Sequence, residues 1–333
     1  MKNKKDLLTL VGPTATGKTS ISIELAKNIG GEIISADSMQ IYRYMDIGTA
    51  KATIAEMKEV PHYLIDVVDP DEEFTVAQYR DKANKYIADI DNRGSFPMVV
   101  GGTGLYLNSL VYELRFTNVK PDQEFRKKYD DMANLYGNEY LYRQLQNVDP
   151  ISAKRINHND RQRIIRALEI FHNTGKPMSY FNKNFRKKTD KYNLIMIALT
   201  MDRADLYSRI NTRVDQMIQD GLIDEVRGLL DMGYDKGLVS MKAIGYKEII
   251  PYIEGQITLD RAIELLKRNT RRYAKRQMTW FRRDNRIKWI HVDRFDSTRS
   301  IVSYIIEYMN RSLNYFRGED YEINDYFTGY VFK

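Results

Sequence analysis

The sequence contains no cysteine and only four histidines among its 333 residues. Without cysteine there is no disulfide scaffold, no cysteine-bound zinc or iron–sulfur cluster, and no thiol nucleophile. The four histidines (His62, His158, His172 and His291) are too few to predict a histidine-rich metal site. Any reactive site must therefore be built from carboxylates, hydroxyls, cationic side chains and the backbone.

Long apolar runs are also missing from the sequence. No stretch reaches the ~18 consecutive apolar residues that a membrane-spanning helix needs. Basic residues precede the apolar run Leu7–Val11, but that run is too short for a signal peptide and leads into a glycine motif. We therefore expect a cytoplasmic protein with no membrane partner, and nothing in the sequence demands more than a monomer.

Positive charge exceeds negative charge only slightly. Lys and Arg number 52 and Asp and Glu number 45, which leaves a net charge of +7. An excess of this size permits an anionic partner without requiring one. The distribution of the charges along the chain is therefore more informative than their sum.

Short apolar runs alternate with helical patterns along the first hundred residues. This alternation predicts an α/β fold, in which a parallel sheet that contains a P-loop is covered by helices. The predicted strands are Leu7–Val11, Glu32–Ser35, Tyr63–Val67 and Pro97–Val100, and the predicted helices are Lys18–Ile29 and Val76–Asn92.

The pattern changes near Asn118, because polar helical stretches without a convincing strand follow as far as about Lys191. Residues 118–190 are therefore predicted to be a helical insertion between a first core part (1–117) and a second core part with basic helices (191–313). Residues 314–333 form a tail whose role the sequence does not indicate. The second core part is predicted to contain strands at Leu194–Leu199 and Ile287–Val292 and helices at Asp202–Met217, Leu222–Met232, Met241–Ile253, Leu259–Arg282 and Ser300–Asn314.

The segment Gly12–Thr19 matches the P-loop pattern and lies between a predicted strand and a predicted helix. Its glycines let backbone N–H groups turn toward phosphate oxygens, and the helix that follows directs its positive end at the anion. Lys18 adds a full positive charge, and the Thr19 hydroxyl can hold Mg²⁺. The pattern does not identify the phosphorylated ligand. The strand Met98–Val100 runs into Gly101 without the carboxylate that many nucleoside triphosphatases carry there, so the loop could equally hold a diphosphate that departs as pyrophosphate.

Asp37 and Ser38 follow the second predicted strand, at the sheet edge where ligands bind in open α/β folds. Asp37 is a candidate general base beside Lys18, although an aspartate here can equally cap a turn. Asp66 and Asp69 are rivals at the end of the next strand. Gly101–Tyr106, after the fourth strand, brings backbone and a hydroxyl to the same edge, or serves only as a turn that needs small residues.

Further segments match one known family in the same order. The segments are Gly12–Thr19, Ser35–Gln40 with Tyr42 and Met45–Lys51, Pro61–Asp66, Gly101–Tyr106, Asp160–Glu169, Arg209–Arg213 with Gly221–Val226, Ala243–Glu248 and Arg271–Asp284. Together they resemble the tRNA dimethylallyltransferases, which prenylate the adenosine next to the anticodon. The resemblance covers about residues 7–292, and its departures are conservative, chiefly Thr16 where the family often has Ser.

The resemblance implies that dimethylallyl diphosphate reacts with the exocyclic N6 amine of the adenosine on the 3′ side of the anticodon and releases diphosphate. In this family the P-loop grips the diphosphate of the prenyl donor rather than ATP, with Mg²⁺ as its counter-ion and Thr19 as the metal-binding residue. The residues implied to bind the diphosphate are Gly12, Thr14, Ala15, Thr16, Gly17, Lys18 and Thr19.

The same resemblance implies roles for residues outside the P-loop. Catalysis would involve Asp37 as the general base together with Lys18 and Thr19, and Arg213 would help to hold the departing diphosphate. The partner would be the anticodon stem-loop of tRNA. The residues implied to contact it are Asp37, Ser38, Met39, Gln40, Thr103 and, in the insertion, Gln162, Arg163, Ile164, Ile165 and Arg166.

Positive charge is concentrated between Arg261 and Ile290. Eleven Lys or Arg stand here against only Glu264 and Asp284, and aromatic residues lie among them. Such a segment suits an RNA backbone, although a solvated helix face is the usual explanation of a charge run. Two other functions stay open at this point: a small-molecule or nucleotide kinase with a helical lid, which leaves the basic segment unused, and a non-catalytic RNA-binding module, which leaves Asp37 unused.

Overall fold

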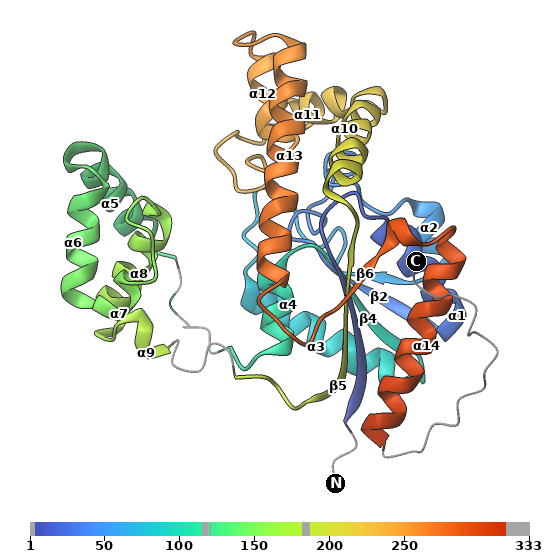
Figure 1. Ribbon diagram of the computed structural model, residues 1–333. Helices are drawn as coiled ribbons and strands as arrows, with labels where there is room; N and C mark the ends of the chain where they lie inside the picture. Colours follow the sequence, from blue (N-terminus) through green and yellow to red (C-terminus); the bar gives the residue numbers. More distant parts are fainter. Residues whose placement is uncertain (1–3, 115–118, 120, 182–186, 318–333) are drawn as a thin grey trace. The chain divides into compact units, whose positions relative to one another are not determined.

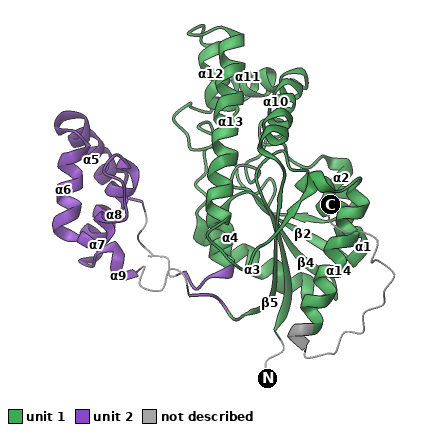
Figure 2. Ribbon diagram, in the orientation of Figure 1, with its two compact units in different colours: residues 1–110, 190–333 green, residues 111–189 purple. Residues whose placement is uncertain are grey.

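The computed structural model describes residues 4–114, 119, 121–181 and 187–317, and it divides into two compact units (Figures 1 and 2). Unit 1 comprises residues 1–110 and 190–333, and unit 2 comprises residues 111–189. Unit 1 contains a parallel sheet with helices on both sides, whereas unit 2 is mainly helical. The predicted α/β class with a mostly helical insertion is confirmed. Residues 318–333 of the predicted tail lie outside the described residues.

In the described part of unit 1, six strands form one parallel sheet in the order β3-β2-β4-β1-β5-β6. The strands are β1 (Lys5–Val11), β2 (Gly31–Ala36), β3 (His62–Tyr63), β4 (Phe96–Gly101), β5 (Tyr192–Thr200) and β6 (Lys288–His291). Near the middle of the sheet, Leu8 of β1 pairs with Met98 of β4 and with Ile195 of β5. All three side chains are buried, as expected for a parallel sheet covered on both faces.

Helices cover the sheet, with α1 and α14 on one side and α3 and α4 on the other (Figure 1). Helices α10 to α13 share a second hydrophobic core with the loop around Ile41 and Met45, next to the carboxyl edge of the sheet. The helices of unit 1 are α1 (Lys18–Ile29), α2 (Ile54–Glu59), α3 (Val76–Asn92), α4 (Gly104–Val111), α10 (Arg203–Gln219), α11 (Leu222–Asp231), α12 (Tyr246–Ile253), α13 (Leu259–Phe281) and α14 (Thr298–Arg317). None of the described helices is both long and apolar enough to cross a membrane.

The third strand is shorter than the sequence predicts. A strand is expected over Tyr63–Val67, but β3 ends at Tyr63. Leu64 and Asp66 adopt left-handed φ angles of 62° and 55°, which an extended strand cannot contain. The chain therefore leaves the sheet, and the N–H groups of Val67 and Val68 donate to the carbonyl oxygen of Ile41 instead of to a strand.

Unit 2 has its own hydrophobic core, which includes Leu141, Leu145 and Ile164. Its helices are α5 (Gln123–Tyr136), α6 (Asn138–Val148), α7 (Pro150–Ala153), α8 (Arg161–Thr174) and α9 (Met178–Phe181). Beside this core, the fully buried carboxylate of Glu169 accepts hydrogen bonds from Arg126 and Arg166. These cations satisfy a charge that would otherwise be costly to bury.

Candidate active site

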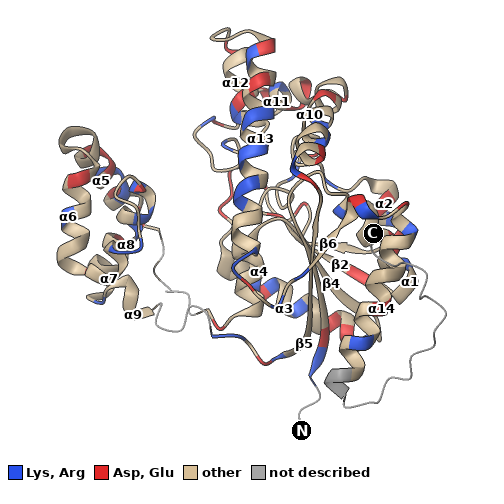
Figure 3. Cartoon of the chain, in the orientation of Figure 1, with Lys and Arg blue, Asp and Glu red and all other residues tan. Residues whose placement is uncertain are grey.

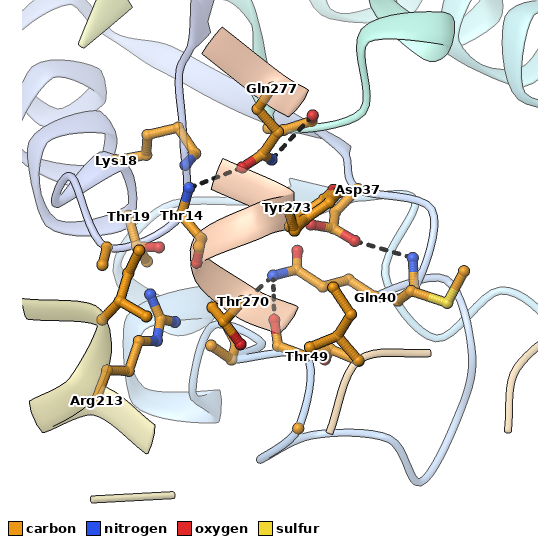
Figure 4. Close-up of a pocket in the computed structure, with 18 of the residues that line it drawn as sticks. Thr14, Lys18, Thr19, Asp37, Gln40, Thr49, Arg213, Thr270, Tyr273 and Gln277 are labelled. Atoms are coloured by element: carbon orange, nitrogen blue, oxygen red, sulfur yellow. Dashed lines mark hydrogen bonds between the residues drawn. The ribbon is translucent and has the colours of Figure 1, made fainter. Parts of the chain in front are cut away.

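A cavity of about 530 Å³ opens in unit 1 at the carboxyl ends of the strands (Figure 4). The P-loop after β1, the segment after β2 and the turn after β4 form one part of its wall, and α10, α13 and residues 242–244 form much of the rest. Ligands bind at this edge in open α/β sheets. The predicted residues that line the cavity are Thr14, Ala15, Gly17, Lys18, Thr19, Asp37, Ser38, Met39, Gln40 and Arg213.

The P-loop has the conformation of a phosphate cradle. Ala15 and Gly17 take left-handed φ angles of 67° and 83°, which turn backbone N–H groups toward one side at the start of α1. The Lys18 ammonium donates to the Pro13 carbonyl oxygen at 2.7 Å, so it is held at the loop. The positive end of α1 and the Lys18 charge therefore act on the same space.

Two residues expected to bind diphosphate, Gly12 and Thr16, do not line the cavity. A Cβ atom on Gly12 would lie 2.5 Å from the Leu199 carbonyl oxygen, so glycine is needed here for the contact between the loop and β5. The Thr16 side chain is buried, and its hydroxyl donates to the Pro13 carbonyl at 2.9 Å. Gly12 and the Thr16 side chain thus support the loop rather than face a ligand.

Asp37, Lys18 and Arg213 form a charged group within the cavity. Burial raises the pKa of the Asp37 carboxyl, although the Met39 N–H and the Lys18 charge oppose that rise. Burial is also the main cause that lowers the pKa of Lys18 to about 7, and the nearby Arg213 lowers it further. The pKa of Arg213 is likewise lowered by burial. Two poorly hydrated cations beside one carboxylate favour the binding of an anion.

Asp37 also serves as a turn residue, because its Oδ1 accepts a hydrogen bond from the Met39 N–H at 2.9 Å. Asp37 therefore caps this turn and, at the same time, lies in the cavity where a general base is needed. The rival carboxylates do not line the cavity: Asp66 accepts from Lys51 at 2.6 Å, and Asp69 accepts from Arg43 at 2.9 Å. The fold thus places Asp37, of the three candidates, in the same cavity as the P-loop.

Hydrogen bonds fix the polar residues that follow β2. The Ser38 N–H donates to the Thr103 hydroxyl oxygen at 3.0 Å, which links the turns after β2 and β4. Gln40 accepts from the Ser35 hydroxyl at 3.0 Å and donates to the carbonyl oxygens of Thr49 and Ala50 at 3.3 and 3.2 Å. The predicted tRNA-contact residues after β2 are therefore already ordered in the free protein.

Sequence reasoning missed the residue that anchors the loop after Met45. The Glu225 carboxylate on α11 accepts hydrogen bonds from three successive N–H groups, those of Asp46, Ile47 and Gly48, at 2.9, 2.7 and 3.0 Å. It also accepts from the Tyr246 hydroxyl at 2.6 Å. The loop in turn carries the carbonyl groups that hold Gln40, so Glu225 supports this wall of the cavity from outside it.

The inner face of α13 was also missed. Thr270, Tyr273 and Gln277 line the cavity from this helix (Figure 4). Their spacing of three and four residues places them on one face. The charges of this segment predict an RNA-binding surface or a solvated helix face, and uncharged polar residues at helical spacing among the basic residues are the signal that indicates this inner face.

The predicted RNA contacts in α8 differ in their surroundings. Gln162 and Arg163 are exposed. Ile164 and Ile165 are buried in the core of unit 2, so their side chains are not available to an RNA surface. Arg166 pairs with Glu169 and donates to the Val119 carbonyl at 3.0 Å, which gives it a structural role.

In the basic segment, Lys and Arg are frequent along α13 (Figure 3), and they divide into cations with and without a carboxylate partner. Arg261, Lys267 and Arg286 form ion pairs with Glu264, Asp215 and Asp284. In the described part of the chain, the exposed cations of this segment without a carboxylate partner are Arg272, Lys275, Arg276, Arg282 and Arg283. Ion pairs on the helix surface therefore account for some of the charge of this segment, and the five exposed cations without a carboxylate partner are available to bind RNA.

The chain is similar to known proteins over most of its length. The family model for IPP transferase matches residues 40–284, which is more than half of the chain. A protein of Thermoanaerobacter sp. (strain X514) named tRNA dimethylallyltransferase is 50% identical over 311 residues, which cover 93% of this chain and 99% of that protein.

Solved structures agree with the sequence matches. The full-length tRNA isopentenylpyrophosphate transferase from Bacillus halodurans is 44% identical with a TM-score of 0.68, and the match covers 94% of this chain and 100% of that one. A eukaryotic dimethylallyltransferase described as acting on tRNA is 27% identical with a TM-score of 0.78, and the match covers 96% of this chain and 81% of that one.

Proposed function

The chain belongs to the IPP transferase family, and on this basis we propose that it transfers a dimethylallyl group from dimethylallyl diphosphate to tRNA. The acceptor is the exocyclic N6 amine of the adenosine on the 3′ side of the anticodon, and diphosphate is released. The observation that carries this proposal is the presence of the phosphate cradle, two cations and a carboxylate of raised pKa in one cavity. We expect the protein to act in the cytoplasm as a monomer.

The reaction needs a base because the N6 amine is a weak nucleophile, whose lone pair is delocalised into the adenine ring. Asp37 accepts a proton from this nitrogen as the new carbon–nitrogen bond forms. Its raised pKa makes it a stronger base than an exposed aspartate, and the nearby cations keep it ionised.

The bond that breaks joins the allylic carbon to a diphosphate oxygen, so negative charge grows on the leaving group. Lys18, Arg213 and the N–H groups of the P-loop stabilise that charge. Lys18 and Arg213 are half-buried, and a site that closes to water when the substrates bind would protect an allylic centre from hydrolysis.

Magnesium fits the cradle on the chemistry of its oxygen donors. The Thr19 hydroxyl lines the cavity and, among the described residues, makes no side-chain hydrogen bond. A hydroxyl together with diphosphate oxygens is a suitable donor set for this hard cation. When bound, Mg²⁺ would neutralise part of the diphosphate charge, and Thr19 would be its protein ligand.

Recognition of tRNA would use the exposed cations of α13 and its end together with Gln162 and Arg163 of unit 2. Enzymes that modify a base must expose it, so the target adenosine would leave the anticodon loop and enter the cavity at Asp37. Ser38, Met39 and Gln40 would then lie against the nucleotide.

The experiment that tests this function incubates the protein with radiolabelled dimethylallyl diphosphate, Mg²⁺ and unmodified tRNA. Transfer of label to tRNA, and loss of transfer when guanosine replaces the target adenosine, are expected. ATP-dependent phosphorylation of a small molecule without label transfer would support the kinase instead, and RNA binding alone would support the non-catalytic module.

A further inference from the structure

The side chain of Gln277 bridges two loops that carry different parts of the site (Figure 4). Its Oε1 accepts a hydrogen bond from the Thr14 N–H of the P-loop at 3.0 Å. Its Nε2 donates to the Gly102 carbonyl, in the turn after β4, at 3.0 Å. Gln277 is only 5% exposed, so both bonds are shielded from water.

The bridge is specific for an amide. A backbone N–H can only donate and a carbonyl can only accept, so the two partners fix which end of the Gln277 amide faces each loop. A charged side chain, or an apolar one of the same size, would leave at least one buried partner unsatisfied.

The backbone of the turn after β4 is shaped around this bridge. A Cβ atom on Gly102 would lie 2.1 Å from the Gln277 Nε2 atom, and one on Gly104 would lie 2.1 Å from the Trp280 ring. Glycine at position 102 therefore leaves the space that the Gln277 amide occupies, and glycine at position 104 leaves the space for the Trp280 ring of α13. The turn that the sequence offered as a ligand contact or a simple strand–helix turn is thus a docking place for this helix.

Tyr273 extends the bridge toward the base. It precedes Gln277 by one helical turn and lines the same cavity, and the side chains of Thr103 and Gln277 lie close enough to its hydroxyl to lower the pKa of this phenol. Asp37 lies close enough to raise the pKa of this phenol further, although burial is the main cause of the rise. One face of α13 therefore contacts the donor cradle and the surroundings of Asp37 at the same time.

We propose that Gln277 is a positioning residue that fixes the phosphate cradle relative to Asp37, so that the allylic carbon and the amine meet in line. This inference rests on the proposed function and deepens it. A diphosphate held by a loop that has lost the bridge would still bind, but its reacting carbon would be displaced. A displacement of about 1 Å is enough to reduce the rate ~100-fold.

The first test replaces Gln277 with methionine, which keeps the length of the side chain and removes both hydrogen bonds. We expect kcat to fall roughly 100-fold, while the tRNA dissociation constant stays within twofold and donor binding is retained. Circular dichroism and thermal unfolding check that the variant is folded. The matched control is Gln256→Met, because the Gln256 side chain is exposed and, within the part of the chain that the structure describes, bonds only to Glu254 on the surface; this variant should behave like the wild type.

The second test uses Gln277→Glu, because the introduced carboxyl group can replace the amide only when it is protonated. A protonated glutamate can accept from Thr14 and donate to Gly102 as the amide does, whereas an ionised one repels the Gly102 carbonyl and the diphosphate. The ratio of variant to wild-type kcat should therefore rise as the pH falls, up to tenfold per unit above the pKa of that glutamate. Both proteins contain Asp37, so the effect of its titration on kcat cancels in this ratio.

Three results would overturn the inference. They are a kcat within threefold of wild type for Gln277→Met, a ratio of variant to wild-type kcat that does not change with pH for Gln277→Glu, or a loss of activity that is matched by an equal loss of tRNA affinity. The last would make Gln277 an RNA contact instead. A wild-type protein that transfers no label to tRNA would refute the proposed function itself, so the two failures are distinguishable.

Discussion

The protonation of Lys18 is expected to change when the donor diphosphate binds in the cavity. In the ligand-free protein its pKa is lowered to about 7, mainly by burial and then by Arg213. The diphosphate is expected to raise this pKa again, so donor binding above pH 7 must take up a proton. Donor affinity should therefore weaken as the pH rises from 7 to 9, by up to tenfold per unit, which calorimetric titration at several pH values would measure.

The control is Lys18→Arg, because arginine stays charged throughout this range. The donor affinity of this variant should not change with pH, and parallel slopes for the two proteins would contradict the assignment.

The lowered pKa of Lys18 also affects the stability of the protein. Between pH 7 and 10.5 the unfolded chain holds a proton that the folded ligand-free protein lacks, so the stability of the ligand-free protein should rise with pH over this window.

Single residues differ in how well the sequence predicts them. Lys18 and Thr19 were predictable because the P-loop spacing dictates their positions. The family resemblance implied Asp37 rather than Asp66, but residue patterns alone did not, since the difference depends on the left-handed turn that takes Asp66 out of the sheet and toward Lys51. Gln277 could not be assigned, because its role depends on the Thr14 and Gly102 backbone groups that are distant in the sequence.

At the scale of elements, the loop after Met45 depends on one carboxylate. Replacing Glu225 with alanine removes the acceptor for three N–H groups and for the Tyr246 hydroxyl. Groups left unsatisfied in this way cost roughly 1–3 kcal/mol each, and partial access of water limits the total, so we expect a loss of roughly 3 kcal/mol in the free energy of unfolding. Denaturant titration would measure it.

The neighbouring Asp224 provides the control, since its side chain is 80% exposed and, among the residues that the structure describes, pairs only with Arg227 on the surface. Asp224→Ala should change the stability by less than about 0.5 kcal/mol. If the two alanine variants were equally stable, the loop would not depend on Glu225. The wall near Gln40 should also loosen in Glu225→Ala, so the KM for tRNA should rise in that variant alone.

Elements with strong periodicity were predicted well, and most of their ends lie within two residues of the prediction. Helix α1 begins and ends where the sequence indicates, because Gly17 and Gly30 bound it. The helix predicted at Met241–Ile253 starts only at Tyr246, since Gly245 has a φ of 108°. Such backbone reversals are decided by tertiary packing, here by the contact between Gly48 and the Tyr246 ring.

At the scale of the whole molecule, the net charge says less about RNA binding than the location of unpaired cations. Arg282 and Arg283 are exposed at the end of α13, whereas Arg261 and Lys267 are paired with acidic side chains. If the first two contact phosphates, replacing both with glutamine should reduce the slope of log affinity against log salt by roughly 1.4–1.8.

The matched control carries the same loss of charge at Arg261 and Lys267, and its salt slope should change little. Filter binding of unmodified tRNA at several salt concentrations would compare the two double variants. Equal slopes would mean that the basic segment acts only through its overall charge. The sequence could not make this distinction, because the partner of Lys267 is Asp215 on a different helix.

The central claim is that the cradle holds the donor while Asp37 takes the proton from the incoming amine. Single-turnover transfer by Asp37→Asn, measured together with donor affinity, tests it most directly. The account predicts a rate lowered by about 10²–10⁴-fold, with the donor dissociation constant changed only a few-fold. A single-turnover rate equal to that of the wild type would contradict it.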